Sequence, residues 1–290
     1  MASEIAHLAS RALIGISGPD WRSFLQGLIT QDVETLQPGE MRYGALLAPQ
    51  GRLLHDLFIT GGDEGATLDV SAAARDGLIA KLTLYRLRAK VQIAPLEGQV
   101  FAAWGDAPAS IISGWHSDPR LDALGRRGVT AAVEGTTSEA AYDAHRLALG
   151  VSDPEKDAVE NDFPIEANFD LLHGIDFKKG CFVGQETTSR MYRRGMVKTR
   201  MAPIRFDGPA LPFGAAVMAG DRRAGEVRSS LNGRAMAVFR IDRAGGHDLT
   251  VNERLVKLDL PAWLAHLFVD ADETPQSTAK LGVEEENADA

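Results

Sequence analysis

The only cysteine of the chain lies in the stretch Lys178 to Glu186, which reads Lys-Lys-Gly-Cys-Phe-Val-Gly-Gln-Glu. Gly180 and Gly184 bracket Cys181, and glycine suits a backbone with positive φ or a close approach to a ligand. Cations beside a thiol lower its pKa and make it more reactive. A lone cysteine is more often a small buried apolar residue, so the residue type alone leaves both interpretations open.

The residues after Gly184 predict a short helix over 185–192. Glu186 falls in its first turn and Arg190 in its last, as the helix dipole favours. Cys181 would then lie just before a helix N-terminus, where free backbone N–H groups can hold an anion or a thiolate.

Charge is spread unevenly over the 290 residues, whose net charge is −9. Residues 270–290 hold seven acids and one base, a charge of −6, which leaves −3 for the rest. This tail is poor in apolar residues and is predicted to be disordered. Residues 178–205 hold eight bases and one acid. That run is either a solvated surface or a site for a polyanion, such as a folate polyglutamate tail or RNA phosphates.

The composition, 44% hydrophobic and 24% charged, is typical of a soluble globular protein. No run reaches the roughly 18 apolar residues of a membrane span. One cysteine excludes an intrachain disulfide and a four-cysteine iron-sulfur cluster held by one copy. The seven histidines show no metal-binding spacing, so no metal site is predicted. With no signal peptide visible at residues 1–10, we infer a reducing, cytoplasmic location.

Hydrophobic periodicity predicts mixed helices and strands in the first 200 residues. Expected strands are 10–16, 42–47, 53–60, 66–71, 90–94 and 128–133, and expected helices are 21–29, 72–87 and 138–149. After residue 201, short strands recur between turns, including the hairpin signal Asn232-Gly233, which favours a small antiparallel barrel. We therefore expect domains at 1–200 and 201–270, with the tail at 271–290.

The run Lys-Gly-Cys-Phe-Val-Gly-Gln-Glu at 179–186 resembles the signature of the YgfZ-type folate-binding proteins. These are relatives of the glycine-cleavage T-protein, an aminomethyltransferase, and include mitochondrial factors for iron-sulfur protein maturation. The resemblance covers roughly residues 10–270. It implies an α+β fold: a T-protein-like folate-binding domain of interleaved antiparallel-sheet subdomains with helices, then a small C-terminal antiparallel β-barrel.

Residues 47–60 resemble the T-protein strand–turn–strand that carries paired aspartates. The second aspartate is present as Asp56, but His55 replaces the first, and Ser71 replaces an asparagine after the next strand. Both departures weigh against full aminomethyl transfer. Glu166 lies where the family has the glutamate that binds the pterin ring. A carboxylate suits that role because it can accept two parallel hydrogen bonds from the ring. Its alternative roles are a helix cap or an arginine partner.

The resemblance thus implies tetrahydrofolate or a one-carbon derivative as cofactor, in a cavity lined by Glu166, Asp56 and Cys181. Lys179 would favour the thiolate, and Gln185 and Glu186 would shape the loop. The implied role is assembly or repair of iron-sulfur proteins, including tRNA-modifying enzymes.

The implied partners are folate and iron-sulfur proteins or cluster carriers, with no membrane; direct nucleic-acid binding is not favoured. Two alternatives stay open: a folate-dependent aminomethyltransferase, and an RNA- or protein-binding adaptor. The residues do not say whether catalytic turnover occurs.

Overall fold

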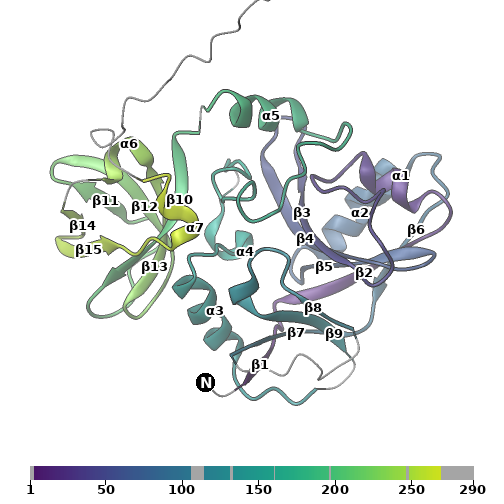
Figure 1. Ribbon diagram of the computed structural model, residues 1–290, viewed down its shortest axis with the longest axis horizontal. Coiled ribbons are helices and arrows are strands. Elements are labelled where there is room, and N and C mark those ends of the chain that lie inside the picture. The colour runs from purple at the N-terminus through teal and green to yellow at the C-terminus, as the bar shows by residue number, and fades with distance from the viewer. Residues whose placement is uncertain are drawn as a thin grey trace, which may run out of the picture.

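The computed structural model describes residues 3–105, 114–130, 133–159, 161–195, 197–245 and 248–268. Two antiparallel sheets and a closed barrel make up this part of the chain (Figure 1). None of the helices in these ranges is long and apolar enough to cross a bilayer. The predicted disordered tail at 271–290 lies outside the described residues.

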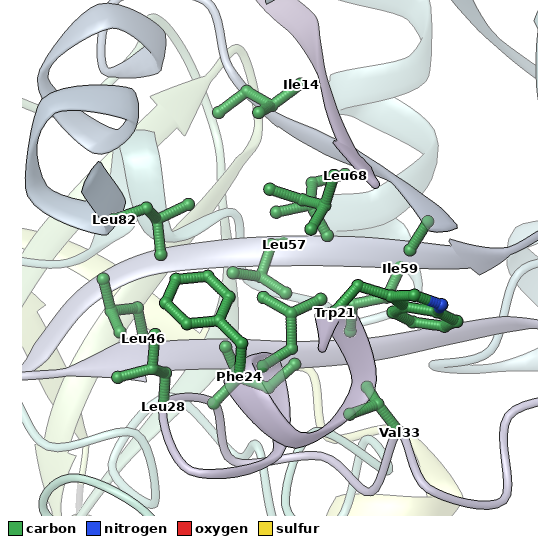
Figure 2. Packing of buried hydrophobic residues seen from close by; sticks show 14 of the residues in the cluster. Ile14, Trp21, Phe24, Leu28, Val33, Leu46, Leu57, Ile59, Leu68 and Leu82 are labelled. Atoms are coloured by element: carbon green, nitrogen blue, oxygen red, sulfur yellow. The ribbon is translucent and has the colours of Figure 1, made fainter. Parts of the chain in front are cut away.

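The larger sheet has the strand order β3-β4-β5-β2-β6 and is buried on both faces. Side chains alternate between the faces. Leu46 packs with residues of helices α1 and α2 on one face (Figure 2), and Tyr43 packs in a different cluster on the other. Its elements are β2 (Arg11–Ser17), α1 (Trp21–Gln26), β3 (Met41–Leu47), β4 (Leu53–Gly61), β5 (Gly65–Ser71), α2 (Arg75–Arg86) and β6 (Gln92–Leu96).

The smaller sheet has the order β1-β7-β9-β8. The chain leaves it after β1, builds the larger sheet, and returns through β7, which confirms the predicted interleaved arrangement. Its elements are β1 (Glu4–His7), β7 (Gln99–Trp104), β8 (Trp115–Ser117), the 3-10 helix η1 (Asp122–Leu124) and β9 (Arg126–Thr130), followed by helices α3 (Glu139–Ala148) and α4 (Pro154–Asp157).

The barrel closes because β10 pairs with both β13 and β15. Asn232-Gly233 makes the turn between β12 and β13, with Gly233 at φ 80°. The predicted C-terminal antiparallel barrel is therefore confirmed. Its elements are β10 (Thr199–Phe206), β11 (Ala216–Ala219), β12 (Arg222–Leu231), β13 (Arg234–Arg240), α6 (Ile241–Ala244), β14 (Leu249–Val251), β15 (Arg254–Leu258) and α7 (Ala262–Ala265).

Local details differ from the prediction where a side chain finds a distant partner. Ser138 caps α3 as expected, its hydroxyl accepting from the Ala141 N–H. Asp20 does not cap α1, because its carboxylate instead accepts from the Lys90 N–H at 2.7 Å. Helix α1 ends at Gln26, short of the predicted residue 29.

Candidate functional site

Cys181 is exposed at the surface. It lies four residues before α5 (Gln185–Arg193), which forms over the predicted span. The next residue, Phe182, is buried in the core beneath the larger sheet. The backbone therefore turns one side chain inward and leaves the sulfur outside, which excludes the buried-apolar interpretation of this cysteine.

The two polar residues that begin α5 behave differently. The Gln185 side-chain amide donates to the Gly180 carbonyl at 3.4 Å and so spans the loop around the cysteine. The exposed Glu186 carboxylate pairs with Arg190 one turn further along the helix. That pairing stabilises the helix rather than the loop.

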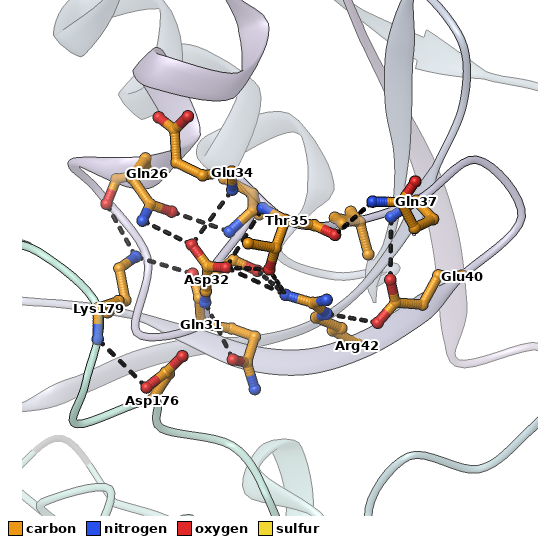
Figure 3. Close-up of polar contacts among 12 residues, drawn as sticks. Gln26, Gln31, Asp32, Glu34, Thr35, Gln37, Glu40, Arg42, Asp176 and Lys179 are labelled. Atoms are coloured by element: carbon orange, nitrogen blue, oxygen red, sulfur yellow. Dashed lines mark hydrogen bonds and ion pairs between the residues drawn. The ribbon is translucent and has the colours of Figure 1, made fainter.

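Lys179 is 9% exposed and points into the protein (Figure 3). Its Nζ donates to three carbonyl oxygens, those of Gln26 at 2.8 Å, Ile29 at 2.7 Å and Gln31 at 2.8 Å. Burial lowers the pKa of Lys179 to about 8. The three ammonium hydrogens are taken by carbonyls, so this geometry does not provide the expected stabilisation of a Cys181 thiolate by Lys179.

Asp56 lies on β4 and is 5% exposed. The Arg11 guanidinium contacts both of its carboxylate oxygens at 3.2 Å. Burial raises the pKa of Asp56, and the arginine only partly offsets that shift. A cavity of about 230 Å³ opens beside this carboxyl group, with His55, Ser71 and residues of α4 in its walls. The buried Ser71 hydroxyl has no hydrogen-bond partner among the described residues.

Glu166 caps a turn. Its carboxylate accepts from the Phe163 N–H at 2.8 Å, and its own N–H donates to the Phe163 carbonyl. Burial raises the pKa of Glu166, and the hydrogen bond from Phe163 opposes the shift. Neither Glu166 nor Cys181 lines the cavity beside Asp56. The expectation that these three residues share that cavity is therefore wrong.

A cluster of buried arginines and aspartates was not found by sequence reasoning. Arg11 and Arg127 both pair with Asp69, at 2.7 and 2.5 Å. Burial alone would raise the pKa of Asp69, but the two arginines outweigh it and hold the pKa below its ordinary value. The other pairs are Arg120–Asp118 and Arg146–Asp157. Arg11 and Arg127 each lie 58 positions from Asp69, so no spacing in the sequence signals that part of the cluster, although Asp118 and Arg120 are only two positions apart.

Part of this cluster links the two sheets, because Arg11 and Asp69 lie on β2 and β5 while Arg127 lies on β9. The guanidinium groups of Arg11, Arg120 and Arg127 lie 5.6, 4.8 and 4.0 Å from the centre of the Phe58 ring, within cation–π range. The void left among these side chains is about 20 Å³, enough for roughly one water molecule. A pterin ring does not fit there.

The basic run at 178–205 is not one continuous surface. Lys179 is buried, and Arg200 is buried in a two-point ion pair with Asp170 at 2.6 and 2.8 Å. Exposed bases remain on α5 and around it, among them Lys178 and Arg193. Within the described ranges, no three His, Cys, Asp or Glu side chains are grouped as a metal ion would need.

Three comparisons with known proteins bear on this arrangement. Residues 198–266 match a family model described as the CAF17, C-terminal beta-barrel domain. The fold resembles the glycine cleavage system aminomethyltransferase T from Bartonella henselae, with a TM-score of 0.74 over 90% of this chain and 86% of that one. The identity is 18%, so this likeness shows the fold alone.

The chain is also similar in sequence to proteins named iron-sulfur cluster assembly factor IBA57 homolog, mitochondrial. The relative from Mycosarcoma maydis is 34% identical over 230 residues, covering 70% of this chain and 57% of the relative. The relative from Chaetomium globosum is 34% identical over 261 residues, covering 75% and 60%. The relative from Phaeosphaeria nodorum is 37% identical over 234 residues, covering 71% and 56%. The chain thus spans less than two thirds of these relatives.

The mitochondrial names of these relatives contradict the cytoplasmic location inferred from the sequence. That inference used the scarcity of cysteine, which indicates a reducing environment but does not say which compartment provides it. The predicted fold class, in contrast, is confirmed. The chain has the architecture of the glycine-cleavage aminomethyltransferase with a closed C-terminal barrel, and most of it is similar in sequence to IBA57 homologues.

Proposed function

We propose that this chain acts in the assembly or repair of iron-sulfur proteins, including tRNA-modifying enzymes, with Cys181 as its functional thiol. The proposal also assigns the chain to the YgfZ-type branch of the aminomethyltransferase fold. The observation that carries it is the exposure of Cys181, because a sulfur at the surface is accessible to another protein. Support for the role comes from the relatives, which are named iron-sulfur cluster assembly factors.

The second part of the proposal is that tetrahydrofolate or a one-carbon derivative binds beside Asp56. The cavity of about 230 Å³ is smaller than the ~300 Å³ at which sites for drug-sized ligands begin, so it suits a ring system rather than a whole folate. Its walls offer the Asp56 carboxyl and the Ser71 hydroxyl, which has no partner among the described residues. A buried polar group without a partner is costly unless a ligand or water satisfies it.

The chemistry of these walls suits the pterin edge, which presents adjacent N–H donors. Asp56 would accept hydrogen bonds from those donors, and Arg11 would hold the carboxyl in place from behind. Burial and the nearby Lys81 lower the pKa of His55, so its ring is neutral where the aminomethyltransferase pattern has a second acid. Tetrahydrofolate, when bound, would supply a carrier for one-carbon units. Glu166 is not part of this pocket.

Two measurements test the proposal separately. Calorimetric titration with tetrahydrofolate should show binding to the wild-type protein, loss of binding in Asp56→Asn, and little change in Glu166→Gln. Removal of the protein from cells should lower the activity of iron-sulfur enzymes, and the wild-type chain should restore it. Absence of folate binding would remove the cofactor but not the assembly role. Robust turnover with an aminomethyl-lipoyl donor would reject the proposal and identify the protein as an aminomethyltransferase.

A further inference from the structure

Cys181 lies in a loop that is hydrogen-bonded to one neighbouring segment from residues on both sides of the cysteine. We define the cysteine loop as residues 173–184 and the anchor segment as residues 26–31, which begin at the last residue of α1. Lys179 holds the anchor segment from one side of the cysteine through its three carbonyl contacts. Val183 holds it from the other side, its N–H donating to the Gly27 carbonyl at 3.2 Å.

The base of the cysteine loop is tied to the same segment. The Asp176 N–H donates to the Thr30 carbonyl at 3.0 Å, and the Thr30 hydroxyl donates to the Gly174 carbonyl at 2.6 Å. The Gln31 side-chain amide donates to the His173 carbonyl at 2.7 Å. Within this set of contacts, Lys179 supplies the only side chain from the cysteine loop that reaches across to the anchor segment.

We infer that Lys179 is a positioning residue for Cys181: its ammonium group fastens the cysteine loop to the anchor segment and so fixes where the sulfur stands on the surface. The inference rests on the proposed function of Cys181 for its biological meaning, but its geometry can be tested without that function. Lys179 does not act on the sulfur directly, since its Nζ donates to three carbonyl oxygens at 2.7–2.8 Å.

The anchor segment is itself held in place by polar contacts to the residues that follow it (Figure 3). Asp32 accepts from the Gln26 side-chain amide at 2.7 Å, and the Arg42 guanidinium contacts the Asp32 carboxylate at 3.3 Å. Burial would raise the pKa of Asp32, but hydrogen bonds from Thr35 and Gln26 outweigh it and hold the pKa at about 2. Asp32 is therefore ionised over the pH range of this experiment.

The lone cysteine provides the probe, because a nitroxide spin label attached to the wild-type chain reports only on position 181. At pH 7 the labelled wild-type protein is expected to show slow, restricted motion of the nitroxide. Lys179→Met should shorten its rotational correlation time severalfold. The matched control is Lys178→Met, the same change at the neighbouring exposed lysine, which should leave the spectrum as in the wild type.

A pH series keeps the test valid even if Lys179→Met folds poorly. The charged groups that face the ammonium group are Asp32 and Glu34, which follow the anchor segment, and Asp176 of its own loop. The pKa of Lys179 is about 8 where it is buried and would be higher in a released, solvated loop, so loss of the proton favours the fastened loop. Label motion in the wild-type protein and in Lys178→Met should therefore stay restricted as the pH rises past 8. Motion that is unchanged by Lys179→Met, or that increases in the wild type as the pH rises from 7 to 9, would overturn the inference.

The outcome is separable from the proposed function. If Cys181→Ser has no effect on iron-sulfur enzymes but the label responds as expected, the positioning role stands and the function falls. If Cys181→Ser abolishes activity but Lys179→Met changes neither label motion nor activity, the function stands and the positioning role falls. If both hold, Lys179→Met should lower in-cell activity while Lys178→Met does not.

Discussion

Gly184 of the cysteine loop lies directly against Gly51 of the turn between β3 and β4. A Cβ atom on Gly184 would stand 3.0 Å from the Gly51 Cα and 2.7 Å from the Ala48 carbonyl oxygen. Both glycines have positive φ, 81° and 85°. The contact joins the base of α5 to the hairpin whose second strand carries Asp56.

This contact predicts opposite results at the two glycines that flank Cys181. Gly184→Ala should destabilise the protein by about 1–2 kcal/mol from its left-handed backbone alone, and by more from the contact with Ala48. Gly180→Ala should be tolerated, because nothing lies within 4 Å of its added methyl group. Urea unfolding of the two variants measures the difference. Equal stability losses would show that the loop does not pack against the hairpin as described.

The sequence was sufficient for the elements whose residues are periodic or whose turns have specific chemistry. The barrel could be predicted from short strands and the Asn232-Gly233 turn, and α5 from the residues after Gly184. The buried arginine–aspartate cluster could not, since Arg11 and Asp69 meet only after β2 and β5 pair. The inward direction of Lys179 was equally hidden, because its three partners are backbone carbonyls about 150 positions away in the chain.

Lys179 should also make stability depend on pH in the alkaline range. Its pKa is about 8 in the folded protein and 10.5 ordinarily, so the unfolded chain binds the extra proton between those values. Stability therefore rises with pH from about 8 to 10.5, by about 3 kcal/mol for this one group. Urea unfolding of wild type and Lys179→Met at pH 7 and pH 10 isolates the contribution. If the two proteins differ in the free energy of unfolding by the same amount at pH 7 and pH 10, the lowered pKa assigned to Lys179 is wrong.

Removal of Arg11 should be strongly destabilising, because it leaves the buried carboxylates of Asp56 and Asp69 short of a partner. The expected loss in the free energy of unfolding for Arg11→Met is about 3–5 kcal/mol, typical of a broken buried ion pair. Arg75→Met is the matched control, since its partner Asp76 is exposed; the expected loss is below about 1 kcal/mol. Similar losses in the two variants would mean that the buried cluster contributes no more to the free energy of unfolding than an exposed ion pair does.

Asp157 should couple the barrel to the rest of the protein. It is fully buried, receives the Arg146 guanidinium at 2.7 Å, and accepts from the Ser229 N–H on β12 at 3.2 Å. Asp157→Ala is expected to lose about 3–5 kcal/mol, because Arg146 stays buried without this partner. Ser229→Ala removes only a hydroxyl and should lose about 1 kcal/mol. Calorimetric melting would show which variant loses more stability. A loss in Ser229→Ala as large as that in Asp157→Ala would argue against the coupling role of Asp157.

The most direct test of the central claim is the activity of iron-sulfur enzymes in cells that lack the protein and carry Cys181→Ser in its place. The substitution changes one exposed atom from sulfur to oxygen, so the fold and the surroundings of Asp56 should persist. The account predicts that the variant accumulates to the wild-type level and leaves those enzymes as inactive as in cells without the protein. Full restoration of their activity by Cys181→Ser would contradict it.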